Sequence, residues 1–341
     1  MTLASGRRID FRMRRSVSSL KIPRVRIRRL GILFGVLTIV PIAICGAARS
    51  IRPTQLSGYK AVPVHYGPLN KMIMSVNIDG QPANLLVDTG ANQIILDASA
   101  AESLGVRPSQ RRLTYIGLTE INGQLLPVGF AQSLTAGSMN FGSSPVALRN
   151  SSTGGGFSNR VEAGNPGIDG VLGLNILLRH KAVINCRTKF IFFKVDQSRQ
   201  VHLASVALSE KFTKVPLRRE ENGVLTVPCS IHGQAGRLVV DTGGFVTTFN
   251  EATVNSLGIS LESTRASARF TSGVRRPISI GQFNDLMIGD FKVPPAKFGV
   301  AMLPNFVLAQ GNTRSVGILG MDLLYKYRAI IDFDSMSLFL K

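Results

Sequence analysis

Two Asp-Thr-Gly tripeptides are the residues of this chain whose types and spacing best suit chemistry. They are Asp88-Thr89-Gly90 and Asp241-Thr242-Gly243, and each directly follows a Leu- and Val-rich run typical of a buried strand. A lone carboxylate is costly to bury, so an Asp at the end of such a strand indicates a specific role. The Thr hydroxyl can donate to a main-chain carbonyl, and a Gly without a Cβ lets backbone N–H groups approach the carboxylate. The two tripeptides are therefore candidate parts of one reactive site.

The chemistry of such a site depends on both carboxylates. If the two halves of the chain pack about a pseudo-twofold axis, Asp88 lies beside Asp241. Carboxylates roughly 3 Å apart cannot both ionise, so the pair shares a proton. The ionised member can take a proton from a bound water while the protonated member donates to the carbonyl oxygen under attack. A single Asp-Thr-Gly is a common tight turn, so the prediction of peptide hydrolysis depends on the repetition of the motif.

The repetition extends well beyond the tripeptides. Gly80-Gln81 recurs as Gly233-Gln234 at the same offset of 153 residues as the two Asp residues. Further on, the segment 170–174, Gly-Val-Leu-Gly-Leu, recurs as Gly-Ile-Leu-Gly-Met over 317–321, at an offset of 147 residues. Two copies of one unit of about 125 residues therefore fill the chain after its N-terminal region.

Each unit is expected to be mostly β. Residues 72–78 alternate apolar and polar, and 83–87 form a short apolar strand before Asp88. Residues 113–130 around Asn122-Gly123, and 269–280 around Ser272-Gly273, are typical of hairpins. Short helices are expected over 97–104, 174–179, 250–257 and 321–327. Short strands joined by Gly-rich turns indicate a closed barrel or sandwich.

These paired motifs resemble those of the retropepsin-like aspartic proteases, specifically the bacterial single-chain type with two fused retropepsin-like domains. The resemblance covers roughly residues 67–341. It implies two closed β-barrel lobes in a pseudo-twofold, pepsin-like bilobal arrangement, with Asp88 and Asp241 as the catalytic dyad. It further implies that the two hairpins are flaps that close over substrate. The remaining roles implied are interlocking across the lobes for Thr89 and Thr242, shaping of the loops for Gly90 and Gly243, and packing beneath the loops for Gly173 and Gly320.

The domain organisation follows from length, charge and the repeat. The chain has 341 residues, of which 44% are apolar, enough for two cores. Because both Asp residues lie in one chain, a monomer is expected. The predicted segments are a basic cytoplasmic leader (1–29), a transmembrane signal-anchor (30–48), a linker (49–66), lobe 1 (67–195), an inter-lobe linker (196–216) and lobe 2 (217–341).

The net charge of +20 is concentrated at the N-terminus, where residues 1–29 hold ten Lys and Arg against one Asp. Residues 30–48 are uncharged and apolar, about long enough to span a membrane. Positive charge before this run predicts an inner-membrane, single-pass anchor with the body outside the cytoplasm. A cleaved signal peptide, which would release a secreted body, stays open because 45–47 resembles a cleavage site. Nucleic acid is not an expected partner, since the basic excess is not on the folded body.

Peptide or protein substrates are the expected partners, and no cofactor or metal is expected because the four His and three Cys are never clustered. Cys186 and Cys229 could form at most one optional disulfide. The alternative function is a catalytically inactive retropepsin-like peptide-binding or scaffold module. Three further features bear on specificity. Phe245 stands where the first copy has Asn92 and could narrow one side of the site, and Tyr115 is either a packing residue or a substrate contact. The basic second hairpin (Arg265, Arg269, Arg275, Arg276) is either a solvated face or a preference for acidic peptides.

Overall fold

A computed structural model of the chain describes residues 56–111, 115–116, 118–121, 124–150, 167–269, 275–310 and 313–341. The predicted leader and anchor, 1–48, lie outside these residues. None of the helices within the described ranges combines the length and the apolar character that a membrane crossing requires.

Lobe 1 is built around a sheet of eight strands in the order β2-β3-β4-β11-β5-β10-β9-β8. Strand β4 runs parallel to β11, and β3, near one end of this order, also pairs with β9, near the other end, so the sheet folds back on itself. The strands are β2 (His65–Tyr66), β3 (Met72–Ile78), β4 (Gln81–Val87), β5 (Ile95–Asp97), β8 (Leu118–Ile121), β9 (Gln124–Ala136), β10 (Met139–Arg149) and β11 (Gly170–Leu172).

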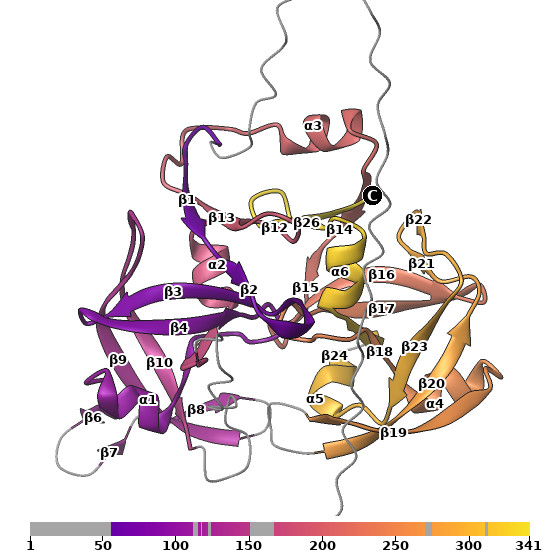
Figure 1. The fold of residues 1–341 in the computed structure, drawn as a ribbon, viewed down its shortest axis with the longest axis horizontal. Helices are drawn as coiled ribbons and strands as arrows, with labels where there is room; N and C mark the ends of the chain where they lie inside the picture. The colour runs from indigo at the N-terminus through magenta and orange to yellow at the C-terminus, as the bar shows by residue number, and fades with distance from the viewer. Residues whose placement is uncertain are drawn as a thin grey trace, which may run out of the picture. The chain divides into compact units, whose positions relative to one another are not determined.

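Lobe 2 repeats this arrangement (Figure 1). Its path is β19-β20-β23-β18-β25-β17-β16-β21-β22, with β15 beside β16 and β24 beside β25. Strand β17 runs parallel to β25 as β4 does to β11, which confirms the internal repeat. The strands are β15 (Arg218–Arg219), β16 (Leu225–Ile231), β17 (Gln234–Val240), β18 (Thr248–Asn250), β19 (Leu261–Arg269), β20 (Arg275–Phe283), β21 (Met287–Ile288), β22 (Phe291–Lys292), β23 (Ala296–Ala301), β24 (Ala309–Gln310) and β25 (Thr313–Leu319).

A third sheet joins the lobes, in the order β1-β13-β12-β26-β27-β14. Its lobe–lobe junction is the antiparallel pairing of β12 with β26. Asp334 of lobe 2 reinforces the junction through ion pairs with Lys181 (2.8 Å) and Lys194 (2.5 Å) of lobe 1. The strands are β1 (Tyr59–Pro63), β12 (Val183–Asn185), β13 (Phe190–Lys194), β14 (Thr213–Pro216), β26 (Ile330–Asp332) and β27 (Ser337–Leu340).

Parts of the two expected linkers belong to the sheets. Residues 59–66, expected as tether, form β1 and β2, and residues 213–216 form β14. Val62, Val64 and Val215 are buried, and their apolar side chains fix these segments against the core. Pro63 and Pro216 lie at the ends of β1 and β14, which are the edge strands of their sheet, where a residue without an N–H is tolerated.

The predicted helices are present as α1 (Ala98–Ser103), α2 (Leu174–Arg179), α4 (Glu251–Ser256) and α6 (Met321–Lys326). Both predicted hairpins are present too: Ile121 pairs with Gln124, and Arg269 with Arg275. Both cysteines are buried and unbonded, so the optional disulfide is not formed. Elements not expected include α3 (Leu203–Ser209), α5 (Asn305–Leu308), the 3-10 turn η1 (Pro68–Asn70), and the pair β6 (Gln110–Arg111) and β7 (Tyr115–Ile116).

One apolar core runs through both lobes and the joining sheet. A smaller cluster in lobe 1 includes Ile73, Leu126 and Ala91, the residue after Gly90. A corresponding cluster in lobe 2 includes Val239 and Ile318. The main core makes the sheets rigid supports, and the two smaller clusters lie on the other face of the strands that lead to the Asp residues.

Candidate active site

The two aspartates are held at equivalent strand ends. Asp88 follows β4, and its N–H donates to the carbonyl of Leu172 in β11 (3.0 Å). Asp241 follows β17, and its N–H donates to the carbonyl of Leu319 in β25 (3.1 Å). In each lobe the parallel strand pair thus fixes the backbone of the Asp independently of its side-chain contacts.

The two threonines lock the lobes together. The Thr89 hydroxyl donates to the carbonyl of Val240 (2.7 Å), and the Thr242 hydroxyl donates to that of Val87 (2.8 Å). Each hydroxyl oxygen also accepts the backbone N–H of the other Thr at 3.0 Å. Both side chains are fully buried. These four reciprocal bonds determine how the two loops meet, as the resemblance implied.

The glycines bring each loop close to the opposite carboxyl group. A Cβ on Gly90 would lie 2.8 Å from Cγ of Asp241, and a Cβ on Gly243 would lie 2.4 Å from Cγ of Asp88. The Gly90 N–H donates to Oδ1 of Asp88, and the Gly243 and Gly244 N–H groups donate to Oδ1 of Asp241, all at 2.8 Å. No residue larger than Gly fits at positions 90 and 243 without moving the pair.

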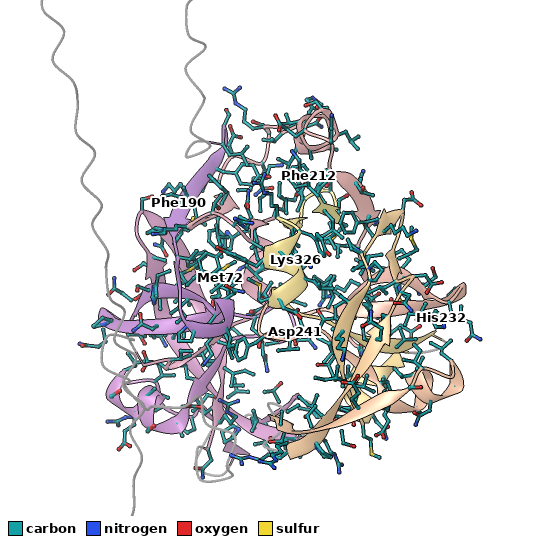
Figure 2. All side chains as sticks on the ribbon, turned by 45° about the vertical axis from the view of Figure 1, so that its right-hand side comes forward. Met72, Phe190, Phe212, His232, Asp241 and Lys326 are labelled. Atoms are coloured by element: carbon teal, nitrogen blue, oxygen red, sulfur yellow. The ribbon has the colours of Figure 1, made fainter. Side chains whose placement is uncertain are left out.

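The carboxyl groups of Asp88 and Asp241 contact one another and share a hydrogen bond. Burial raises the pKa of Asp88 well above its usual range, and the nearby charge of Asp241 raises it further. Burial also raises the pKa of Asp241, but hydrogen bonds from Asp88, Gly244 and Gly243 oppose that rise. Asp241 is the more exposed of the two and lies where the lobes meet (Figure 2). The pair therefore shares one proton.

Helices α2 and α6 begin beneath the two loops. The Leu174 N–H donates to the carbonyl of Ala91 (2.8 Å), and the Met321 N–H donates to that of Gly244 (2.7 Å). A Cβ on Gly173 would lie 2.4 Å from the carbonyl oxygen of Gln93. A Cβ on Gly320 would lie 2.8 Å from that of Gly244. The repeated Gly-Val/Ile-Leu-Gly motif thus supports the loops from below.

Asn92 and Phe245 occupy equivalent positions after Gly90 and Gly243, and each contacts the other lobe. The type of contact differs between the two lobes. Phe245 packs on the lobe 1 cluster of Ile73 and Leu126, with the Lys71 ammonium 4.9 Å from its ring centroid. Asn92 instead donates from Nδ2 to the carbonyl of Asn222 (3.0 Å). Phe245 therefore fastens the lobe 2 loop to lobe 1, a contact that the sequence alone did not indicate.

Two polar contacts near the loops were not predicted. Gln93 donates from Nε2 to the Thr119 hydroxyl (3.0 Å), which joins the Asp88 loop to the β8–β9 hairpin. In lobe 2, Asp322 accepts the N–H (2.9 Å) and the hydroxyl (2.7 Å) of Thr247. In the sequence, the one feature that could have pointed to these contacts is that Gln93, Thr247 and Asp322 lie within a few residues of the repeated motifs.

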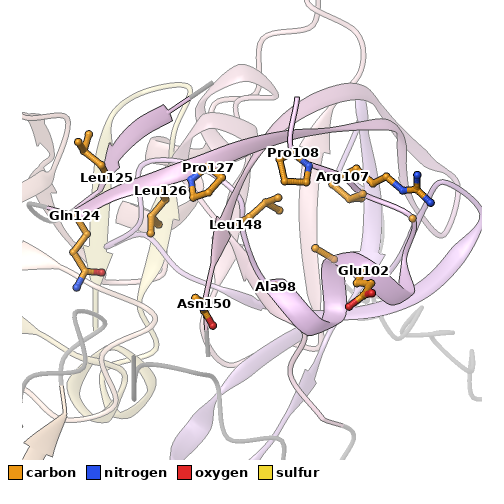
Figure 3. A pocket seen from close by; sticks show the side chains of 13 residues that line it. Ala98, Glu102, Arg107, Pro108, Gln124, Leu125, Leu126, Pro127, Leu148 and Asn150 are labelled. Carbon is orange, nitrogen blue, oxygen red and sulfur yellow. The ribbon is translucent and has the colours of Figure 1, made fainter. Parts of the chain in front are cut away.

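A cavity of about 950 Å³ lies away from the aspartates, behind the first hairpin. Figure 3 shows it between α1, with Glu102, and the start of β9, with Leu126 and Pro127. Leu148 and Asn150 close one side. Neither Asp88 nor Asp241 lines it, so we assign it no part in the chemistry of the pair.

A family model described as aspartyl protease matches residues 74–176 and 227–323, one Asp-Thr-Gly in each segment. A search of curated proteins returned no match. Among solved structures, the aspartic proteinase from Irpex lacteus aligns with 83% of this chain and 96% of its own, at 12% identity and a TM-score of 0.45. Because the family model matches more than half of the residues, the chain belongs to the aspartyl protease family.

Proposed function

We propose that the protein is an aspartic endopeptidase that hydrolyses peptide bonds with a water activated between Asp88 and Asp241. The observation that carries the proposal is the reciprocal threonine lock, which brings two buried carboxyl groups into contact. A purely structural turn would not require a second carboxylate to be buried beside the first, because that arrangement is costly unless one group is protonated.

The reaction needs only these two side chains and water. Ionised Asp241 takes a proton from the water, whose oxygen bonds to the carbonyl carbon of the substrate, while Asp88 gives its proton to the carbonyl oxygen. The tetrahedral intermediate then collapses. Its C–N bond breaks as Asp241 returns the proton to the leaving amine, and Asp88 recovers a proton from the hydroxyl. The N–H groups of Gly243 and Gly244 stabilise the Asp241 anion at the start of the cycle.

Digestion of a mixed peptide library by the full chain tests this proposal. New peptide termini should appear with a bell-shaped pH dependence. The rate falls at low pH, where Asp241 also becomes protonated, and at high pH, where Asp88 loses its proton; both apparent pKa values belong to the pair. A substrate mimic with a hydroxyl in place of the hydrated carbonyl should inhibit, whereas a chelator and a serine-directed acylating agent should not. Peptides that bind but are never cut would favour the scaffold alternative.

We further propose that residues 30–48 anchor the protein in the inner membrane, with a monomeric body outside the cytoplasm. The charge asymmetry around this apolar run supports the orientation. A reporter fused after Lys341 should be active only outside the cytoplasm, and the protein should sediment with membranes. Recovery of the body from the soluble cytoplasmic fraction would contradict both the anchor and the signal-peptide alternative, and activity that collapses on dilution would contradict the monomer.

A further inference from the structure

The hairpins of the two lobes can be aligned residue by residue through their sheets. In lobe 1, Val128 of β9 pairs with Ala147, which continues the sheet to β5. In lobe 2, Ile280 of β20 pairs with Gly299, which continues it to β18. Because β5 and β18 directly follow the two catalytic loops, Val128 and Ile280 occupy equivalent positions. Counting back along each strand makes Ile278 the equivalent of Leu126, and Arg276 the equivalent of Gln124.

The same alignment shows on which face of β20 the residue Arg276 lies. Leu126 is buried in the cluster that includes Ala91 of the first catalytic loop, so its face of β9 is turned toward that loop. In lobe 2, Ile278 lies near the position of a Gly299 Cβ (3.6 Å), as does the Thr248 hydroxyl (3.3 Å). Since alternate residues of a strand share a face, Arg276 shares the face of Ile278, and Arg275 points to the opposite face.

The charges of the two hairpins differ. Within the described residues, strands β8 and β9 carry Glu120 and no Lys or Arg, whereas β19 and β20 expose Arg265, Arg275 and Arg276. The acid of the second hairpin, Glu262, is already bound to Lys297 at 2.8 and 2.9 Å. No ion pair of Arg276 is found among the residues that the structure describes, so its guanidinium remains available for a carboxylate.

We propose that Arg276 selects acidic side chains in the half of the substrate that lies against lobe 2. The inference rests on the proposed peptidase function and names a substrate class for it. A guanidinium binds a carboxylate through paired N–H donors, which a neutral amide cannot reproduce. Lobe 1 has Gln124 at the equivalent position, so the preference applies to one side of the scissile bond only.

Arg276→Gln, which reproduces the lobe 1 residue, tests the proposal, and Arg275→Gln on the opposite face of the same strand is the matched control. The wild-type protein should enrich Glu and Asp at one or two positions on a single side of the cleaved bonds. Arg276→Gln should reduce the cleavage ratio of a Glu peptide to its Gln counterpart by about fivefold, the scale of an exposed ion pair. Arg275→Gln should leave that ratio unchanged. The wild-type preference should also fade as pH falls through about 4, where peptide Glu becomes protonated.

A second measurement separates this inference from the proposed function. The affinity of Asp88→Asn for the same two peptides does not depend on hydrolysis, and it should show the same preference for Glu, removed by adding Arg276→Gln. If the wild type cuts peptides without an acidic preference, or if both arginine variants lose it equally, the role of Arg276 is wrong although the peptidase stands. If no peptide is cut but the binding preference holds, the peptidase is wrong and the role of Arg276 stands.

Discussion

Asp88→Asn and Asp241→Asn should each lower the rate of peptide hydrolysis by about 10²- to 10⁴-fold, the range that a positioned acid or base contributes. Asn has nearly the shape of Asp, but its amide can neither take a proton from water nor give one to the substrate carbonyl. The two losses should be similar because each carboxyl group has a separate duty. Initial rates on one cleaved peptide, measured across the pH range, give both effects.

The same two variants should fold at least as well as the wild type. The pKa of Asp88 is raised by burial and by Asp241, so the folded state binds this proton more tightly than the unfolded chain. The stabilisation that this provides is complete below the unfolded pKa and is lost as pH rises through the folded pKa. Asn at position 88 has no proton to lose, so the thermal midpoint of Asp88→Asn should fall less than that of the wild type over the same rise in pH.

The same variants test whether the active site is formed by loops from two different molecules. If Asp241→Asn kept most of its activity, two Asp88 loops from different molecules would be the better explanation, and the rate would then rise with the square of protein concentration. Equal mixtures of the two inactive variants provide the matched test. In each variant the single active site lacks one of its two carboxylates. A mixture of Asp88→Asn and Asp241→Asn should therefore remain inactive.

Local pattern was sufficient to predict the elements that carry the pair. The helices over 174–179 and 321–327, the strand before each Asp and both hairpins were predicted, because each combines a periodic apolar pattern with a Gly-containing boundary. The meeting of Asp88 with Asp241 followed from the repeat, because equal units that pack about a pseudo-twofold axis must bring equivalent loops together. Neither step needed knowledge of long-range contacts.

Contacts that differ between the lobes could not be predicted in this way. The strand β1 depends on its partner β13, more than 120 residues later in the chain, and its own sequence resembles a tether. Phe245 suggested a narrowed site, yet its ring packs on the opposite lobe. The bond between Gln93 and Thr119 joins a loop to a hairpin through side chains that carry no distinctive pattern. Such contacts arise from the difference between two copies, which the repeat itself does not specify.

The largest loss of stability is expected at another such difference, the ion pair of Arg149 with Asp97. These residues are opposite one another in β10 and β5, and Nη2 of Arg149 lies 2.9 Å from Oδ1 of Asp97. Both side chains are almost fully buried, at 4% and 1% exposure. Arg149→Met removes one charge and leaves the other inside the lobe, so the free energy of unfolding should fall by about 3–5 kcal/mol. Urea denaturation of the full chain measures it.

Lobe 2 has an uncharged pair of residues at the position equivalent to Arg149 and Asp97. Its equivalent register pair is Asn250 and Ala301, and Asn250 accepts the Leu303 N–H through Oδ1 (3.4 Å). Asp97→Asn combined with Arg149→Met should therefore recover part of the stability that Arg149→Met loses, because no charge then remains buried. Lys297→Met, which breaks the exposed pair with Glu262, is the control and should cost less than about 1 kcal/mol. If the double variant is as unstable as the single one, the loss of unfolding free energy comes from the packing of the Arg149 side-chain methylenes and not from its charge.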